Sequence, residues 1–215
     1  MAVKPNCVKK HQKFAVLGGG SWATAIVKML CENLDEVCWY MRNSEAIDHI
    51  REHGHNPNYL SSVSFDTAKL RLTDQVDEAI SVGDILIFAI PSAFLEEELS
   101  KMTVSLRGKV IFSAIKGIVP ESGRIVGEHF HEAYQIPFED IGVITGPCHA
   151  EEVALERLSY LTIACSDRKK AEAVAAALRS PYIKTRVSKD IIGTEYAAML
   201  KNIYAIAAGI AHGLG

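Results

Sequence analysis

The sequence predicts an α/β protein: a Rossmann-like, doubly wound, mainly parallel sheet, followed by the start of an α-helical second domain. Two patterns carry this prediction. Apolar runs of strand length alternate with segments of helical periodicity, and a glycine turn follows the first run. The runs are apolar at consecutive positions, which is typical of strands covered by helices on both faces. The expected strands are 14–17, 37–41, 85–90, 110–115, 141–144, 160–165 and 182–187, and an alanine-rich helix is expected over 169–179.

The glycine turn lies between the first expected strand and the first expected helix, in the run Gly18-Gly19-Gly20-Ser21-Trp22-Ala23. In a dinucleotide-binding turn, Gly18 makes the sharp bend, Gly20 lets a phosphate approach, and Ala23 is small where the helix meets the strand. Amides at the helix N-terminus then face the anion. Apolar residues at 26, 27, 29 and 30 continue at helical spacing, which favours this interpretation over a purely structural turn, the alternative that stays open.

The composition is that of an ordinary globular protein. Of 215 residues, 48% are hydrophobic and 23% charged, without a low-complexity segment. The net charge of −3 gives no basic footprint, so no nucleic-acid partner is expected. No apolar stretch reaches the roughly 18 residues of a membrane span, and the polar start lacks the apolar core of a signal peptide. We therefore expect a cytoplasmic protein with no membrane span.

The cysteines and histidines give no sign of a disulfide framework or a metal centre. The five cysteines are an odd set without C-x-x-C spacing, which predicts reduced thiols: Cys7, Cys31, Cys38, Cys148 and Cys165. His49, His53 and His55 cluster, but no acidic ligand motif accompanies them. No metal site is predicted.

From residue 191 the pattern changes to one long helical stretch rich in small residues, with no strand after it. We expect residues 1–189 to form the NAD(P)-binding domain. Residues 190–215 would be the incomplete beginning of a helical substrate-binding domain. A C-terminal helix packed on the sheet is the alternative.

Arg42 stands where dinucleotide domains usually carry an acid for the adenosine ribose, roughly 20 residues after the glycines. Its planar guanidinium can pair with the oxygens of a 2′-phosphate. The position therefore points to NADP, while NAD stays open. A solvated arginine at a strand end is the alternative.

Further polar residues follow the ends of the expected parallel strands, where ligands bind in such sheets. An ammonium at Lys116, after an apolar strand, is costly unless an anion or a carboxylate meets it. Gly146-Pro147 fits either a ligand loop or an ordinary turn. In the long helix, Lys201 and Asn202 either meet solvent or face a cleft, and in a cleft Lys201 could donate or accept a proton.

Taken in order, these motifs resemble the bacterial-type NAD(P)-dependent glycerol-3-phosphate dehydrogenases over nearly the whole chain. The segments that carry the resemblance are 18–25, 90–92, 116–118, 146–151, 200–203, 207–210 and 213–215. The resemblance implies cofactor contacts from Gly18, Gly20, Ser21, Trp22, Arg42, Lys116 and Ala150. It implies substrate contacts from Lys116, Gly146, Cys148, Lys201 and Asn202, with Lys201 as the catalytic proton-transfer residue.

The reaction that this resemblance implies is reversible NADP(H)- or NAD(H)-dependent reduction of dihydroxyacetone phosphate to sn-glycerol 3-phosphate, feeding glycerophospholipid synthesis. Two alternatives stay open. One is another hydroxy-acid or sugar-nucleotide dehydrogenase with the same domain plan, and the other is a dinucleotide-sensing module without catalysis. The sequence does not fix the oligomeric state, and a homodimer is compatible with it.

The chain departs from the family pattern at three positions and in length. Ala23 replaces a usual glycine, Cys148 a usual serine or threonine, and His149 a common aromatic residue. Ala23 keeps the required smallness, but a thiol donates hydrogen bonds weakly, which puts a side-chain contact of Cys148 with substrate in question. The family's helical domain also continues past the position of Gly215. We therefore expect this chain alone to bind cofactor and to be catalytically poor or inactive.

Overall fold

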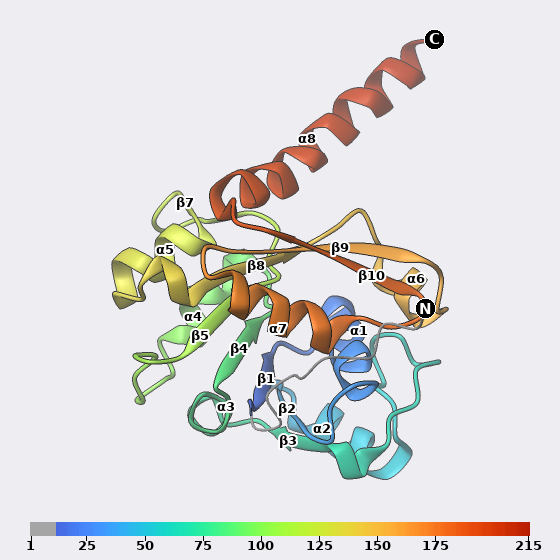
Figure 1. Ribbon diagram of the computed structural model, residues 1–215. Coiled ribbons are helices and arrows are strands. Elements are labelled where there is room, and N and C mark those ends of the chain that lie inside the picture. The colour runs from blue at the N-terminus through green and yellow to red at the C-terminus, as the bar shows by residue number, and fades with distance from the viewer. Residues whose placement is uncertain (1–11) are drawn as a thin grey trace, which may run out of the picture.

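The computed structural model describes residues 12–215, except for the side chain of residue 202, and its centre is an eight-stranded sheet (Figure 1). The strand order is β10-β9-β8-β5-β4-β1-β2-β3. Neighbours from β8 to β3 pair in parallel, β9 pairs antiparallel to β8, and β10 pairs parallel to β9. The strands are β1 (Phe14–Leu17), β2 (Val37–Tyr40), β3 (Leu70–Thr73), β4 (Ile85–Phe88), β5 (Val110–Ser113), β8 (Ile141–Thr145), β9 (Ser159–Cys165) and β10 (Ile183–Ser188). The predicted Rossmann-like fold is confirmed.

Helices cover both faces of this sheet, as the apolar strands predict. Alternate residues of one strand enter different cores: Phe14 and Val16 lie in one cluster, Ala15 and Leu17 in the other. The first core contains residues of α1 (Ser21–Cys31), α2 (Ser44–His53), α6 (Ala150–Ala154) and α7 (Arg168–Leu178). The second contains residues of α3 (Val76–Val82), α4 (Leu95–Leu99) and α5 (Val126–Tyr134).

Short elements complete the fold, and several of them lack a strong sequence pattern. They are the 3-10 helices η1 (Thr67–Lys69), η2 (Ser92–Phe94) and η3 (Phe138–Asp140) and the hairpin of β6 (Ile118–Val119) with β7 (Arg124–Ile125). Sequence analysis missed β3, because this edge strand is buried only at its last two residues and is not a continuous apolar run. Three predicted strands also run too long: residues 41, 89–90 and 114–115 are buried or half-buried but lie in loops beyond the strand ends.

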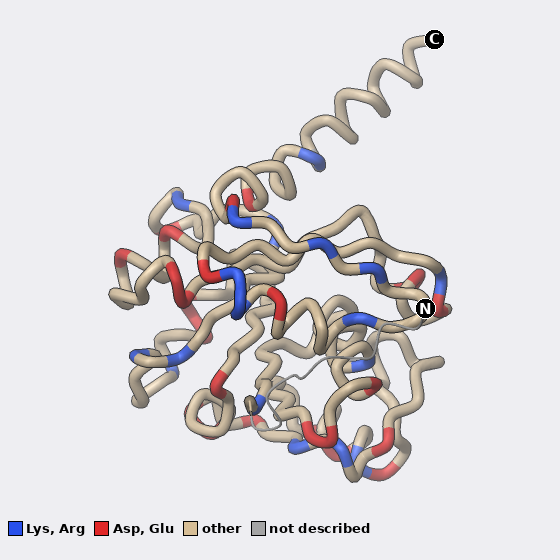
Figure 2. Tube along the Cα trace, viewed as in Figure 1, with Lys and Arg blue, Asp and Glu red and all other residues tan. Residues whose placement is uncertain are grey.

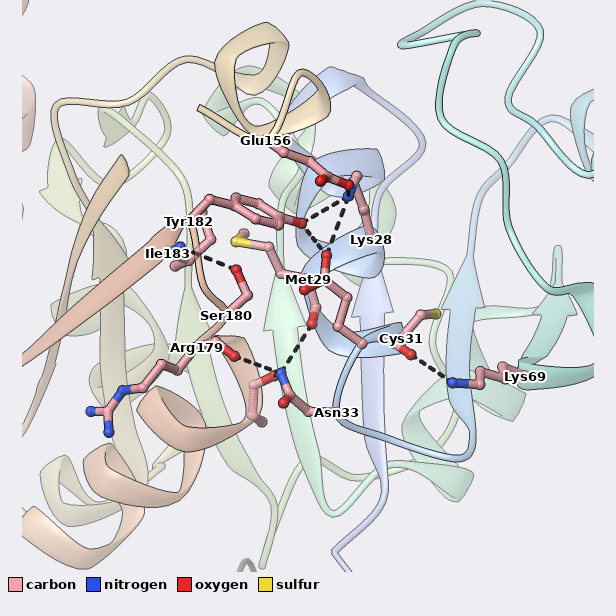
Figure 3. Close-up of polar contacts among 12 residues, drawn as sticks. Lys28, Met29, Cys31, Asn33, Lys69, Glu156, Arg179, Ser180, Tyr182 and Ile183 are labelled. Atoms are coloured by element: carbon pink, nitrogen blue, oxygen red, sulfur yellow. Dashed lines mark hydrogen bonds and ion pairs between the residues drawn. The ribbon is translucent and has the colours of Figure 1, made fainter. Parts of the chain in front are cut away.

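Helix α1 is tied to the distant β9–α7–β10 region by a group of polar contacts (Figure 3). Lys28 Nζ donates to Glu156 Oε1 at 3.0 Å and to Tyr182 Oη at 2.8 Å. Although burial lowers it, the hydrogen bonds to Tyr182 and Glu156 hold the pKa of Lys28 above its ordinary value. Asn33 Nδ2 donates to the carbonyl oxygen of Arg179 at 2.9 Å. The last turns of α1 and the loop that follows it are therefore tied to this region.

Helix α8 (Ile191–Leu214) begins against the sheet and then projects away from it (Figure 1). Asp190 caps its first turn by accepting from Gly193 N at 2.8 Å, and Ile191 and Glu195 are buried. From residue 203 onward the helix is exposed. Residues 196–215 contain one Lys or Arg, Lys201, and no Asp or Glu, and most of the projecting helix is accordingly tan in Figure 2.

Helix α8 begins at Ile191, with Asp190 as its N-cap, and the division into domains at residues 189 and 190 stays a prediction. Among the helices of residues 12–215, none combines the length and the apolar character that crossing a membrane requires. The four cysteines within the described residues are free thiols, whereas Cys7 lies outside them.

Candidate functional site

The glycine turn after β1 has a backbone that requires glycine at position 18. Gly18 has φ +135°, and a Cβ built on it would lie 2.4 Å from the carbonyl oxygen of Ala89, after β4. The turn is held by Gly18 N donating to the Tyr40 carbonyl at 3.0 Å and by Trp39 Nε1 donating to the Gly18 carbonyl at 2.7 Å. The turn therefore lies between β1 and its two neighbours, where the strand order reverses and ligands of such sheets bind.

The N-terminus of α1 is open to a ligand. Gly20 is its N-cap and offers no side-chain cap, and a Cβ at this position would meet nothing within 4 Å. The first amides of the helix thus lack side-chain partners and carry the positive end of the helix dipole. Ser21 and Trp22 in the first turn are half-buried, and Ala23 is fully buried. Such bare amides suit an anion, and that they bind the pyrophosphate of a dinucleotide stays a prediction.

Asn56, which sequence analysis missed, holds the glycine turn from the side. Its side chain is buried and donates from Nδ2 to the Gly19 carbonyl at 3.2 Å and to Thr24 Oγ1 at 3.0 Å. Its Oδ1 accepts from the amides of Asn58 at 3.0 Å and Tyr59 at 3.3 Å. One side chain therefore joins the loop after α2 to the glycine turn and to α1.

A cavity of about 490 Å³ opens on the β2 side of the turn. Its lining includes all three glycines of the turn, the strand-end residues 40–43, Asn56, Phe94 and Glu98. Arg42 lies at its edge, with the guanidinium 5.3 Å from the Phe94 ring centre. Its Nη1 is 3.9 Å from Glu97 Oε1 and 3.7 Å from Glu98 Oε1. The predicted cofactor residue is thus at the cavity, but it already faces two carboxylates.

Glu98 is the second residue that sequence analysis missed, and it is a buried carboxylate in the cavity wall. It accepts from Tyr40 Oη at 2.5 Å and from Lys101 Nζ at 2.6 Å. Although burial raises it, the hydrogen bonds from Lys101 and Tyr40 hold the pKa of Glu98 below its ordinary value. No local pattern marks Glu98, because it is one of three consecutive glutamates on an amphipathic helix.

A second cavity, of about 460 Å³, opens on the β5 side of the turn. Its lining brings together residues that the sequence places far apart: Ser21, Trp22, Lys116, Cys148 and Ala150. Both cavities share Gly20, Ala89, Ile90 and Pro91 in their linings, so they adjoin across the end of β4. Five predicted site residues therefore meet on one side of the turn, and Arg42 lies on the other.

Trp22 and Lys116 face each other in the second cavity. Lys116 is exposed, and its Nζ is 5.8 Å from the Trp22 ring centre, an attractive cation–π arrangement. Trp22 Nε1 is buried and has no hydrogen-bond partner. A buried donor without a partner is uncommon and is satisfied when a ligand or water supplies an acceptor. This supports a polar ligand beside Trp22.

Cys148 is a buried residue of the second cavity. The residue is 4% exposed, and burial raises the pKa of its thiol, while the charges of Lys116 and Lys201 oppose that rise. Lys116 lines the same cavity as Cys148, whereas Lys201 is exposed on α8 and is not among the residues that line it. At Gly146 an added Cβ would lie 2.2 Å from the Tyr160 carbonyl oxygen, so a close backbone approach explains this glycine. The side chain of Asn202 lies outside the described residues.

Glu195 is a titratable group of α8 that the sequence does not connect to any site. It is 6% exposed and accepts from the amide of Gly127 in α5 at 2.9 Å. Burial raises the pKa of its carboxyl to about 7. The group fixes the base of the helix that carries Lys201.

Comparison with known proteins gives a consistent set of relatives. Residues 13–171 match the model of the N-terminal part of NAD-dependent glycerol-3-phosphate dehydrogenase, and residues 190–215 match the model of its C-terminal part. Glycerol-3-phosphate dehydrogenase (NAD(P)+) of Pseudomonas fluorescens is 36% identical over 206 residues, covering 96% of this chain and 60% of the relative. The enzyme of the same name from Bacillus subtilis is 35% identical over 208 residues, covering 95% and 59%.

Solved structures agree with the sequence comparison. The chain is similar to glycerol-3-phosphate dehydrogenase from Plasmodium falciparum, with a TM-score of 0.85, 25% identity and coverage of 94% of this chain and 59% of the other. It is similar to the enzyme from Coxiella burnetii with a TM-score of 0.81, 26% identity and coverage of 95% and 62%. A reductive aminase from Aspergillus terreus, at 18% identity, shares only the fold, with a TM-score of 0.64. The chain spans about 60% of the length of the curated relatives that it matches.

Proposed function

Because the chain belongs to the NAD-dependent glycerol-3-phosphate dehydrogenase family, we propose that it contributes the cofactor site and part of the substrate site of such an enzyme. The proposed reaction is the reversible reduction of dihydroxyacetone phosphate to sn-glycerol 3-phosphate. The observation that carries this proposal is that Trp22, Lys116 and Cys148, which lie far apart in the sequence, line one cavity beside the glycine turn.

NAD(P)H, when bound, supplies the hydride of this reaction. The glycine turn and the bare N-terminus of α1 hold the pyrophosphate, with Gly18, Gly20, Ser21 and Trp22 as its backbone contacts. Lys116 and Ala150 in the second cavity would hold the nicotinamide end. Arg42 in the first cavity would hold the adenosine end.

The substrate is a phosphorylated ketone, and cationic groups on this chain suit its charge. Lys116 holds the substrate and stabilises the negative charge that develops on the carbonyl oxygen. Gly146, Cys148 and Asn202 supply further substrate contacts, and Cys148 does so through its backbone rather than its weakly donating thiol. Lys201 in its ammonium form donates a proton to the developing alkoxide, and in the reverse direction its amine accepts that proton.

The test is the oxidation of NADH and of NADPH in the presence of dihydroxyacetone phosphate, with the complete product of the gene and with its Lys201→Ala variant. Loss of the proton donor should lower kcat at least about 100-fold, the scale of general acid catalysis, and leave the affinity for NADH within about twofold. Glu172→Gln, a charge change on the exposed side of α7, serves as the control. Retained turnover in Lys201→Ala would refute the assigned role.

The same family membership supports three wider proposals. The product sn-glycerol 3-phosphate feeds glycerophospholipid synthesis, the protein acts in the cytoplasm, and it forms a homodimer. We also propose that this chain alone, which spans about 60% of its relatives, binds dinucleotide but turns over poorly. Comparison of its turnover with that of a full-length relative tests this, and comparable rates would contradict it.

A further inference from the structure

The first cavity, where the proposed dinucleotide would place its adenosine ribose, carries an unusual arrangement of charges. An acid after β2 commonly binds the ribose hydroxyls, but here Arg42 and Asn43 follow the strand. The Asn43 side chain is already used, because its Oδ1 caps α2 by accepting from Ala46 N at 3.1 Å. Arg42 is therefore the polar side chain of this strand end that remains for the ribose.

Arg42 is not a free cation. Its guanidinium faces Glu97 Oε1 at 3.9 Å and Glu98 Oε1 at 3.7 Å. The Glu98 side chain is only 4% exposed, so water screens its charge weakly. A 2′-phosphate that pairs with Arg42 would have to draw the guanidinium away from this carboxylate and then lie close to it.

Glu98 cannot relieve the repulsion by moving or taking up a proton. Tyr40 Oη at 2.5 Å and Lys101 Nζ at 2.6 Å donate to its two oxygens and stabilise the charged form. Lys101 also lies 3.5 Å from Glu97 Oε1, so two cations and two carboxylates balance one another at this wall. Among the described residues that line the cavity, Arg42 is the only basic residue of the Lys and Arg type, and Glu98 is the only acidic residue.

The two cofactors differ at this point by a phosphate of about −1.5 to −2 charges at neutral pH. Without a net positive charge in the wall, the phosphate gains no compensation for its desolvation and repulsion by Glu98. A ribose hydroxyl carries no charge and can donate to a carboxylate.

We infer that this site selects NAD(H) over NADP(H), with the carboxylates of α4, Glu98 and Glu97, as the specificity determinants. The acid that discriminates the cofactors thus comes from α4 and not from the end of β2. This inference rests on the dinucleotide binding proposed above, and it reverses the preference that Arg42 alone predicts from the sequence.

The test is direct binding of NADH and of NADPH to the chain at low and at moderate salt. Energy transfer from tryptophan to the reduced nicotinamide reports the binding. NADH should bind about tenfold more tightly than NADPH at low salt, and the ratio should shrink as salt screens the repulsion. Glu98→Gln keeps the shape of the side chain and should tighten NADPH binding about tenfold, with NADH within about twofold. Glu97→Gln, on a side chain that is 57% exposed, should act in the same direction without touching the core.

Glu172→Gln provides the matched control, since it removes the same charge from an exposed pair with Arg168 on the other face of the sheet. It should leave both affinities unchanged. The inference would be overturned if the unaltered chain bound NADPH more tightly than NADH. It would also be overturned if the ratio of the NADPH affinity to the NADH affinity were unchanged in both α4 variants. Absence of binding by either dinucleotide would instead overturn the proposed function, and this inference with it.

Discussion

Replacement of Asn56 by alanine should loosen the glycine turn and destabilise the fold. The buried side chain makes four hydrogen bonds, two donated to the Gly19 carbonyl and Thr24 Oγ1 and two accepted from the amides of Asn58 and Tyr59. At about 0.5–1 kcal/mol net for each bond, Asn56→Ala should lower the free energy of unfolding by about 2–4 kcal/mol. The affinity for NADH should fall about tenfold, because the Gly19 carbonyl loses the partner that orients it.

Urea denaturation followed by circular dichroism measures the first effect, and tryptophan-to-nicotinamide energy transfer measures the second. Asn56→Asp tests the donated hydrogen bonds separately from the accepted ones. Its carboxylate still accepts from the loop amides but places an acceptor against the Gly19 carbonyl, so it should weaken NADH binding as much as alanine does. Asn58→Ala is the stability control, since that residue contributes only its backbone amide to this group of bonds. A loss below about 0.5 kcal/mol for Asn56→Ala, with unchanged NADH affinity, would refute the reasoning.

Two further predictions concern the turn and α8. Gly18→Ala places a Cβ 2.4 Å from the Ala89 carbonyl oxygen, so it should lower the free energy of unfolding by at least about 3 kcal/mol and abolish NADH binding. The control Gly123→Ala is also at positive φ but has nothing within 4 Å, so it should lower the free energy of unfolding by only about 1 kcal/mol. Equal losses for the two variants in urea denaturation would contradict this prediction. Burial raises the pKa of Glu195 to about 7 from 4.5, so the folded state holds an extra proton between these values and the stability that this group contributes falls as pH rises through that window. Glu195→Gln can still accept a hydrogen bond from Gly127 N. It should raise the free energy of unfolding by up to about 3 kcal/mol at pH 8 and change it little at pH 4.5. A change in stability that does not depend on pH would count against this assignment.

Local sequence patterns determined most of the fold and the first half of the site. The strands flanking the turn are continuous apolar runs, and Gly18, Gly20 and the uncapped start of α1 follow the first of them within a few residues. Burial on both faces, turn geometry and helix periodicity all act over such short distances, so they can be read from the chain. The edge strand β3 and the hairpin of β6 and β7 could not, since each is short and partly exposed.

Tertiary structure decided which side chains meet at the turn and with what charge. Asn56 reaches Thr24 from 32 residues away, and Glu98 reaches Tyr40 from 58 residues away, and neither glutamate nor asparagine carries a local signal of such a contact. Arg42 shows the difference most clearly. The sequence identified it as a cation at the end of β2, but only the packing of α4 against that strand brought Glu98 beside it and changed the charge that a bound cofactor meets. Pairwise electrostatics depend on distance in space, and the order of strands and helices, not the order of residues, sets that distance.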